Sequence, residues 1–73
     1  MKAYIDTKVA IPIPGTAGDD FAEVVTEQDY NERGPHSISH RTARHASADE
    51  AYADAASWAK RRGLAVVLSS DDF

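Results

Sequence analysis

The chain has 73 residues, no cysteine and a formal net charge of −4 at pH 7. This length allows one domain with one small core. Without cysteine there is neither a disulfide framework nor a thiolate metal site, which excludes the disulfide-rich secreted class and fits a reducing compartment. Charged residues and prolines interrupt every apolar run in the first fifteen residues. We therefore predict no signal peptide and no membrane span there, and we expect a cytoplasmic location, in a cell or an infected host.

Charge is unevenly distributed along the chain. Residues 1–32 carry a net charge of −5, residues 33–45 carry +3 and residues 46–73 carry −2. An acidic first segment repels nucleic acid and suits a basic surface on a partner protein. The alternative is that these acids only keep a small domain in solution.

Residues 2–13 alternate between apolar and polar side chains, as a half-buried strand does. One face of this strand would carry Ala3, Ile5, Thr7, Val9, Ile11 and Ile13. Proline has no N–H to donate to a neighbouring strand, so Pro12 and Pro14 predict an edge position or the exit into a turn. Residues 14–20 then read as a loop.

The next two segments, 21–30 and 36–45, are predicted to pair as a hairpin around the turn at Gly34 and Pro35. The periodicity of 21–30 is ambiguous, because the same residues also fit a helix capped by Asp19. Two adjacent valines and a threonine favour the strand. Segment 36–45 is polar and only weakly apolar on either face, which indicates an edge strand.

Residues 48–62 have the clearest helical pattern in the chain. Ser47 is a good N-cap, and Glu50, three residues later, can accept a hydrogen bond from the backbone N–H of that cap residue. Gly63 can adopt the left-handed conformation that ends a helix. An apolar stripe recurs at three- and four-residue steps through Ala51, Tyr52, Ala55, Trp58 and Ala59. We expect Tyr52 and Trp58 to contribute most to the core, since aromatic side chains bury the largest areas.

Residues 64–68 are consecutive apolar residues, typical of a strand buried on both sides, and residues 69–73 form a polar, acidic tail. The predicted element order is β-β-β-α-β. It describes an α+β two-layer sandwich, with a mostly antiparallel sheet of three to four strands and one helix packed on one face. We expect residues 1–73 to form a single domain.

Acidic residues provide the first candidate site. If 21–30 is a strand, Glu23, Glu27 and Asp29 form a row on one face, with Glu32 near its end. Neighbours on one face of a strand are about 6–7 Å apart, close to the phosphate spacing along one nucleic-acid strand. Such a row could occupy a groove on a nucleic-acid-binding protein, so these four acids are predicted to contact a basic partner. The alternative is a solvent-facing strand whose charges discourage edge pairing.

Segment 33–45 provides the second candidate, an anion or nucleic-acid site. Its cations are Arg33, His40, Arg41 and Arg44, and phosphate contacts need clustered cations. The acidic total charge and the lack of an aromatic residue in this segment argue against it. His36 and His40 would lie roughly 13 Å apart on one strand, too far for a single metal ion. No metal and no cofactor are therefore predicted.

Catalysis is not predicted either. The sequence contains no nucleophile elbow, phosphate loop, paired-carboxylate motif or zinc-protease motif. A domain this small also forms a deep pocket with difficulty. The chain is therefore expected not to be an enzyme.

The closing stretch Ala46–Leu68, ASADEAYADAASWAKRRGLAVVL, resembles the helix–strand unit that ends many small β-β-α-β proteins of phages and mobile elements, the anti-CRISPR proteins among them. The likeness covers about a third of the chain and is one of architecture. It implies a non-enzymatic protein that binds a host complex stoichiometrically through charges of its sheet or loops.

The sequence thus predicts a small protein-binding module. In its sharpest form this is a phage-encoded inhibitor that occludes a host CRISPR or other nucleic-acid-handling complex through an acidic surface. Two alternatives stay open. One is a nucleic-acid-binding or autoregulatory module that uses segment 33–45, and the other is a homodimer closed by strand pairing at the exposed edge of 36–45. No membrane partner is expected.

Overall fold

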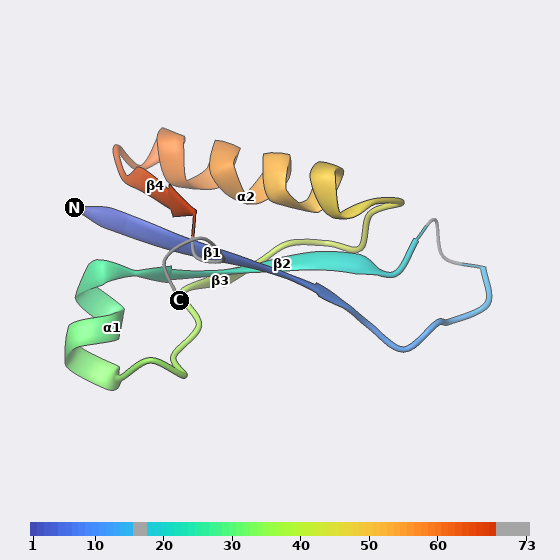
Figure 1. Ribbon diagram of the computed structural model, residues 1–73, viewed down its shortest axis with the longest axis horizontal. Coiled ribbons are helices and arrows are strands. Elements are labelled where there is room, and N and C mark those ends of the chain that lie inside the picture. The colour runs from blue at the N-terminus through green and yellow to red at the C-terminus, as the bar shows by residue number, and fades with distance from the viewer. Residues whose placement is uncertain (16–17, 69–73) are drawn as a thin grey trace.

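The computed structural model describes residues 1–15 and 18–68. Along the chain its elements are β1 (Lys2–Val9), β2 (Asp20–Thr26), α1 (Glu27–Arg33), β3 (His40–Arg41), α2 (Ala48–Arg61) and β4 (Ala65–Leu68). Figure 1 shows one layer of strands with α2 above it and α1 below one end.

The four strands form one mixed sheet in the order β3-β2-β1-β4. The pairs β1–β2 and β2–β3 are antiparallel, whereas β4 lies parallel to β1. An α+β fold with a mostly antiparallel sheet is therefore confirmed. The predicted order β-β-β-α-β is wrong, because the described residues contain two helices and follow the order β-β-α-β-α-β.

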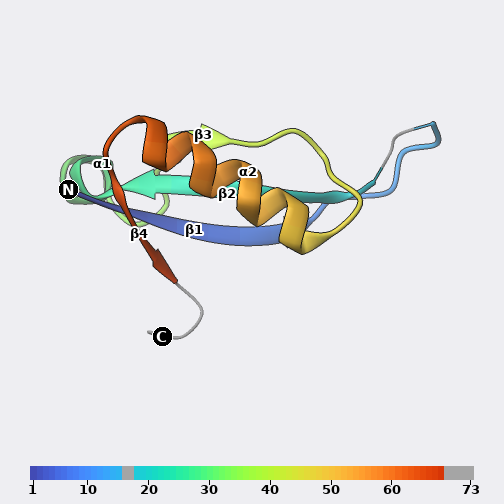
Figure 2. The same ribbon diagram turned by 90° about the horizontal axis from the view of Figure 1, so that it is seen from above.

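The core lies between α2 and the face of the sheet beneath it. Seen from above, α2 lies across β1 and β2 (Figure 2). The buried apolar residues are Ala3, Ile5, Ala22, Val24, Ala51, Ala55 and Ala59. Five of these seven are alanines, so helix and sheet approach each other closely. Tyr52 and Trp58 are partly buried and pack against the margin of this cluster.

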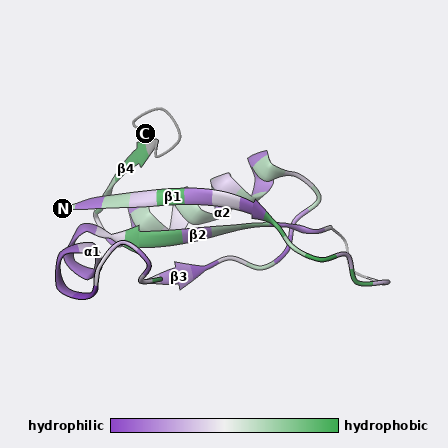
Figure 3. Cartoon of the chain, turned by 60° about the horizontal axis from the view of Figure 1, so that its bottom comes forward, coloured by the Kyte–Doolittle hydropathy of each residue, from purple (hydrophilic) through white to green (hydrophobic). Residues whose placement is uncertain are grey.

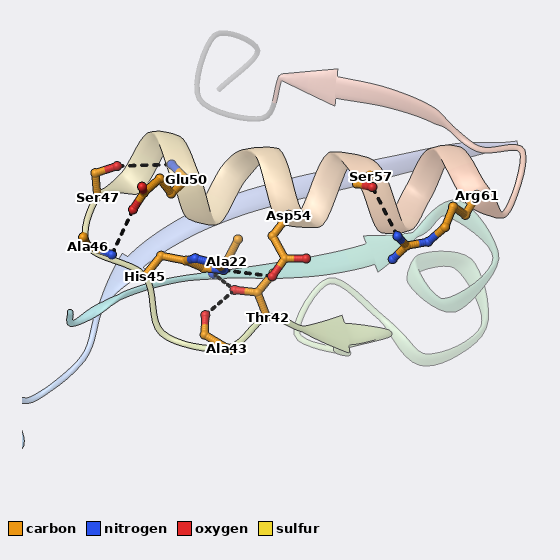
Figure 4. A network of polar contacts seen from close by, with 10 residues as sticks. All are labelled: Ala22, Thr42, Ala43, His45, Ala46, Ser47, Glu50, Asp54, Ser57 and Arg61. Atoms are coloured by element: carbon orange, nitrogen blue, oxygen red, sulfur yellow. Dashed lines mark hydrogen bonds and ion pairs between the residues drawn. The ribbon is translucent and has the colours of Figure 1, made fainter. Parts of the chain in front are cut away.

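Helix α2 has the caps that the sequence predicts, with one difference (Figure 4). The Ser47 Oγ accepts a hydrogen bond from the Glu50 N–H at 3.2 Å. The Glu50 carboxylate accepts from the N–H of Ala46, at 3.1 Å, instead of from the cap residue. At the other end, Gly63 has φ +72° and its N–H donates to the Lys60 carbonyl, as a left-handed helix terminus requires. The helix spans Ala48–Arg61, one residue less than predicted.

The predicted strand 21–30 is correct only as far as Thr26. There the Thr26 Oγ1 accepts a hydrogen bond from the Asp29 N–H at 3.1 Å and caps α1. The first turn of α1 contains acids and its last turn contains Arg33, which suits the helix dipole. Gly34, with φ +98°, ends the helix, and its N–H donates to the Tyr30 carbonyl. The alternative helix capped by Asp19 is also wrong, because Asp20–Thr26 is strand β2.

The other predicted strands are shorter than expected. Strand β1 ends at Val9 instead of residue 13, and β4 begins at Ala65 instead of residue 64. Of 36–45 only His40–Arg41 is a strand, with one further bridge between His45 and Asp20. Polar side chains replace ladder bonds here, since the Thr42 Oγ1 accepts from the Ala22 N–H at 2.9 Å. The predicted tail 69–73 lies outside the described residues.

Candidate functional site

The face of the sheet opposite α2 is a hollow of about 1000 Å³. Strand alternation turns Tyr4 and Lys8 of β1 to this face, and the register sets Val25 of β2 opposite Tyr4. Helix α1 bounds one end, where the Tyr30 ring lies 5.8 Å from the Tyr4 ring. Ile38, in the segment after α1, also lines the hollow. We call this surface the hollow from here on.

One end of the hollow is apolar and aromatic. It is lined by Tyr4, Val25, Tyr30, Ile38 and Val67. Tyr30 and Ile38 are large side chains that remain 44% and 43% exposed. Because exposed apolar side chains that gather in one concave surface mark contact sites more often than scattered ones do, this end is a candidate binding surface.

The other end of the hollow holds a charged cluster centred on Glu23. The Lys8 Nζ lies 2.9 Å from Glu23 Oε1, and the Arg41 Nη2 lies 2.6 Å from Oε2. Glu23 is only 8% exposed, whereas Lys8 and Arg41 are about half exposed. Burial alone raises the pKa of Glu23, but the hydrogen bonds and charges of Lys8 and Arg41 outweigh it and hold that pKa below its ordinary value of 4.5. Glu23 is therefore an ionised, internally neutralised carboxylate.

Replacing Glu23 by glutamine is expected to lower the free energy of unfolding at pH 7 by about 1 kcal/mol, a modest cost because both cationic partners stay half in water. The pKa of Glu23 is lower in the folded chain than in the unfolded one. Its stabilising contribution is thus complete above pH 4.5 and is lost as the pH falls through the lower folded-state pKa. Urea unfolding of both proteins at pH 7 and about pH 3 should show a difference that shrinks on acidification. An equal difference at both pH values would contradict this account.

The four acids predicted to contact a partner do not form a row. Glu23 lies in β2, while Glu27, Asp29 and Glu32 lie in α1, where the helical period turns them in different directions. The Asp29 carboxylate accepts a hydrogen bond from the Ser39 hydroxyl, and Glu27 accepts one from the Lys2 N–H at 3.4 Å. Of these four acids, Glu32 is the most clearly turned to solvent. The predicted row required a strand that extends to residue 30, whereas β2 ends at Thr26.

The four predicted cationic residues are likewise dispersed. Arg41 lies in the hollow, whereas the neighbouring His40 lies on the opposite face and stacks on Trp58 at 4.6 Å. The Arg44 guanidinium donates to the Ile11 carbonyl at 2.9 Å and lies 3.5 Å from Asp19. Arg33 is exposed in the last turn of α1. Residues that are close in sequence therefore do not form one cationic patch.

Over residues 1–15 and 18–68, no group of three or more histidine, cysteine, aspartate or glutamate side chains could hold a metal ion. Within the same residues, neither helix is long and apolar enough to cross a membrane. The His45 Nε2 lies 2.8 Å from the Asp54 carboxylate, and this contact ties the loop before α2 to that helix (Figure 4).

Sequence reasoning missed the aromatic part of the hollow. The signal was Tyr4, a large aromatic residue on the otherwise polar face of the first strand. A strand over residues 21–30 would put Tyr30 on the inward face with Val24, so the sequence does not predict a contact between Tyr30 and Tyr4. No family model, no curated protein and no solved structure matches the chain.

Proposed function

We propose that the chain is a small protein-binding module without catalytic activity, and that the hollow is its contact surface. The observation that carries this proposal is a hollow with an aromatic and apolar end, where Tyr30 and Ile38 are exposed, and with Arg41 at its other end. Tyrosine and arginine are enriched among the residues that dominate binding energy in protein interfaces. A half-open hollow of about 1000 Å³ also suits a protruding segment of a polypeptide better than an enclosed small molecule.

The sharpest form of the proposal is an inhibitor that occludes a host CRISPR or other nucleic-acid-handling complex. This form rests on the resemblance of residues 46–68 described above and on the acidic net charge. A basic partner surface would be met by exposed acids such as Asp6, which follows Tyr4 by two residues along β1, and Glu32 of α1. Glu23 makes no such contact in this proposal, because Lys8 and Arg41 already neutralise it.

A pull-down from bacterial lysate, with and without nuclease, tests the proposal. Ile38→Asp places a charge in the apolar end of the hollow and is expected to reduce partner recovery at least about tenfold. Ala53→Asp is the matched control, since Ala53 is exposed on α2 on the other side of the sheet and should leave recovery unchanged. Both proteins are quantified by mass spectrometry after elution.

Two outcomes would contradict the proposed function. Recovery of only nucleic acid, or of proteins that are lost on nuclease treatment, would favour the alternative of a nucleic-acid-binding module that uses the cationic residues of segment 33–45. Equal partner recovery by Ile38→Asp and Ala53→Asp would show that the partner does not bind in the hollow. Circular dichroism of both variants first establishes that they are folded, as expected for replacements at exposed positions.

A further inference from the structure

The last residue of β1 and the segment that follows it carry exposed apolar side chains away from the body of the domain. Val9 is 74% exposed, Ile11 is 83% exposed and Ile13 is 51% exposed. Pro12 and Pro14 alternate with them. We call residues 9–15 the arm. Figure 1 shows the arm at the end of the sheet away from α1, and Figure 3 shows a hydrophobic stretch where it leaves β1.

Although its side chains are exposed, the base of the arm is held in place. The Ala10 N–H donates to the Asp19 carbonyl at 2.8 Å. The Arg44 guanidinium donates to the Ile11 carbonyl at 2.9 Å and pairs with Asp19 at 3.5 Å. Backbone hydrogen bonds that fix the arm while Val9 and Ile11 remain in water reduce the entropy that the arm would lose on binding. The arm is therefore partly preorganised for binding.

We propose that, in the absence of the protein partner, the hollow binds the arm of a second copy of this chain, and that two copies exchange arms in a two-fold dimer. This inference rests on the proposed function, since it takes the hollow as a polypeptide-binding surface. It differs from the strand-paired homodimer considered from the sequence. That dimer needs a long free edge at 36–45, and β3 is only two residues long.

The arrangement of the domain suits a reciprocal contact. The arm and α1 lie at opposite ends of the sheet, and Figure 1 shows the arm leaving β1 toward the side on which α1 lies. When two such domains face each other about a two-fold axis, each end of one copy meets the opposite end of the other. Both arms then reach an apolar end of a hollow. The same contact forms twice.

The chemistry of the two surfaces is complementary. Residues 9–15, VAIPIPG, contain no charged side chain. A segment with alternating prolines favours an extended conformation, and extended proline-containing segments dock in grooves lined by aromatic side chains. Tyr4 and Tyr30 supply such a lining, with Ile38 beside them. An uncharged arm suits this apolar end of the hollow better than it suits the end with Lys8 and Arg41.

The available area fits a weak dimer. At about 30 Å² of apolar surface per CH₂ group, the exposed parts of the Val9, Ile11 and Ile13 side chains offer about 200–250 Å². Each arm covers a comparable area of the facing hollow, so two reciprocal contacts bury about 800–1,000 Å² in total. Protein complexes that bury less than about 1,200 Å² are typically weak and transient. The arms therefore suit a dimer that forms only at high protein concentration.

Sedimentation equilibrium of the full chain tests the dimer. We expect wild-type protein to dimerise with rising concentration and Ile11→Asp to raise the dimer dissociation constant at least about tenfold, because a charge would enter an apolar contact. Ile11→Val keeps the contact apolar and should behave as wild type. A wild-type chain that stays monomeric at every concentration would overturn the inference, and so would a dimer that Ile11→Asp leaves intact.

Cysteine cross-linking identifies the contacting surfaces, since the chain has no cysteine of its own. Ile11→Cys mixed with Ile38→Cys should form an intermolecular disulfide faster than Ile11→Cys mixed with Ala53→Cys, whose thiol lies on the exposed side of α2. Faster cross-linking of Ile11→Cys to itself would indicate arms that pack on each other and would contradict arm exchange.

The two proposals fail separately. Ile11→Asp leaves the hollow intact, so it should lose the dimer and still capture the protein partner that Ile38→Asp fails to capture. A monomeric wild type with an Ile38-dependent partner would refute the dimer alone. Conversely, a dimer sensitive to Ile11→Asp together with partner capture insensitive to Ile38→Asp would show that the protein partner binds outside the hollow, while the hollow still binds a polypeptide segment, the arm.

Discussion

Replacing Ala55 by leucine is expected to lower the free energy of unfolding by about 2–3 kcal/mol and the melting temperature by about 10–20 °C. Ala55 is fully buried at the centre of α2, with Ala51 and Ala59 one turn to either side. The sheet beneath it presents Ala3 and Ala22, so the contact is made by small side chains from both layers. A leucine enters this close-packed contact only if α2 moves away from the sheet.

The matched control is Ala53→Leu, which makes the same chemical change at an exposed position of the same helix. Alanine and leucine both favour helices, so this control should change the free energy of unfolding by no more than about 0.5 kcal/mol. Urea denaturation followed by circular dichroism measures both variants. Equal stability of Ala55→Leu and Ala53→Leu would show that the two layers have room between them, and would contradict the close approach.

The parts of the fold that could be predicted are those in which a local pattern coincides with burial. Helix α2 has good caps, high intrinsic propensity and an apolar stripe, and all three agree. The alternation in β1 correctly identifies Ala3 and Ile5 as residues of the buried face. The same alternation fails from Thr7 onward, because the rest of β1 and the arm are exposed and no burial distinguishes their two faces.

Helix α1 was not predicted, and strand β3 was predicted at the right place but too long, because neither is specified by an apolar pattern. No residue of α1 is buried, and the helix is defined by the Thr26 cap, its first-turn acids and Gly34. These cap signals are present in the sequence, but two valines before Thr26 favoured continuing the strand. In the segment before α2, the hydroxyl groups of Ser39 and Thr42 accept hydrogen bonds from backbone N–H groups of β2. Such side-chain replacements of a ladder depend on tertiary placement and leave no periodicity.

The candidate site shows the same division. Strand parity alone places Tyr4 and Lys8 on the face opposite Ala3. Which of the two faces a single helix covers follows from the apolar residues, so an uncovered polar face is predictable. The ion pairs on that face are not predictable, because the partners of Glu23 come from β1 and β3, which are distant from it in sequence. The net charge of residues 1–32 therefore counts Glu23 as a carboxylate available to a partner, although Lys8 and Arg41 neutralise it.

Replacing Gly18 by alanine is expected to be as damaging as the change at Ala55, with a loss of about 3 kcal/mol or more. A Cβ at this position would collide with the carbonyl group of His45 and lie 2.6 Å from the Cα of Ala46. These are backbone atoms, which cannot rotate aside. They belong to the bridge in which the His45 N–H donates to the Asp20 carbonyl at 2.6 Å and the Asp20 N–H donates back at 3.1 Å. Relieving the collision breaks this bridge and loosens the loop that carries His45 to Asp54 of α2.

Gly15→Ala is the control in the same connection. Its Cβ meets open space, but its φ of +89° is unfavourable for alanine, so we expect a loss of only about 1–2 kcal/mol. Thermal unfolding of the three proteins measures the difference, and hydrogen exchange at the Asp20 and His45 amides locates it. Fast exchange at both amides in Gly18→Ala, with wild-type protection in Gly15→Ala, is the expected result. A Gly18→Ala protein that is as stable as Gly15→Ala and keeps both amides protected would mean that β2 and the loop before α2 do not approach as closely as the bridge requires.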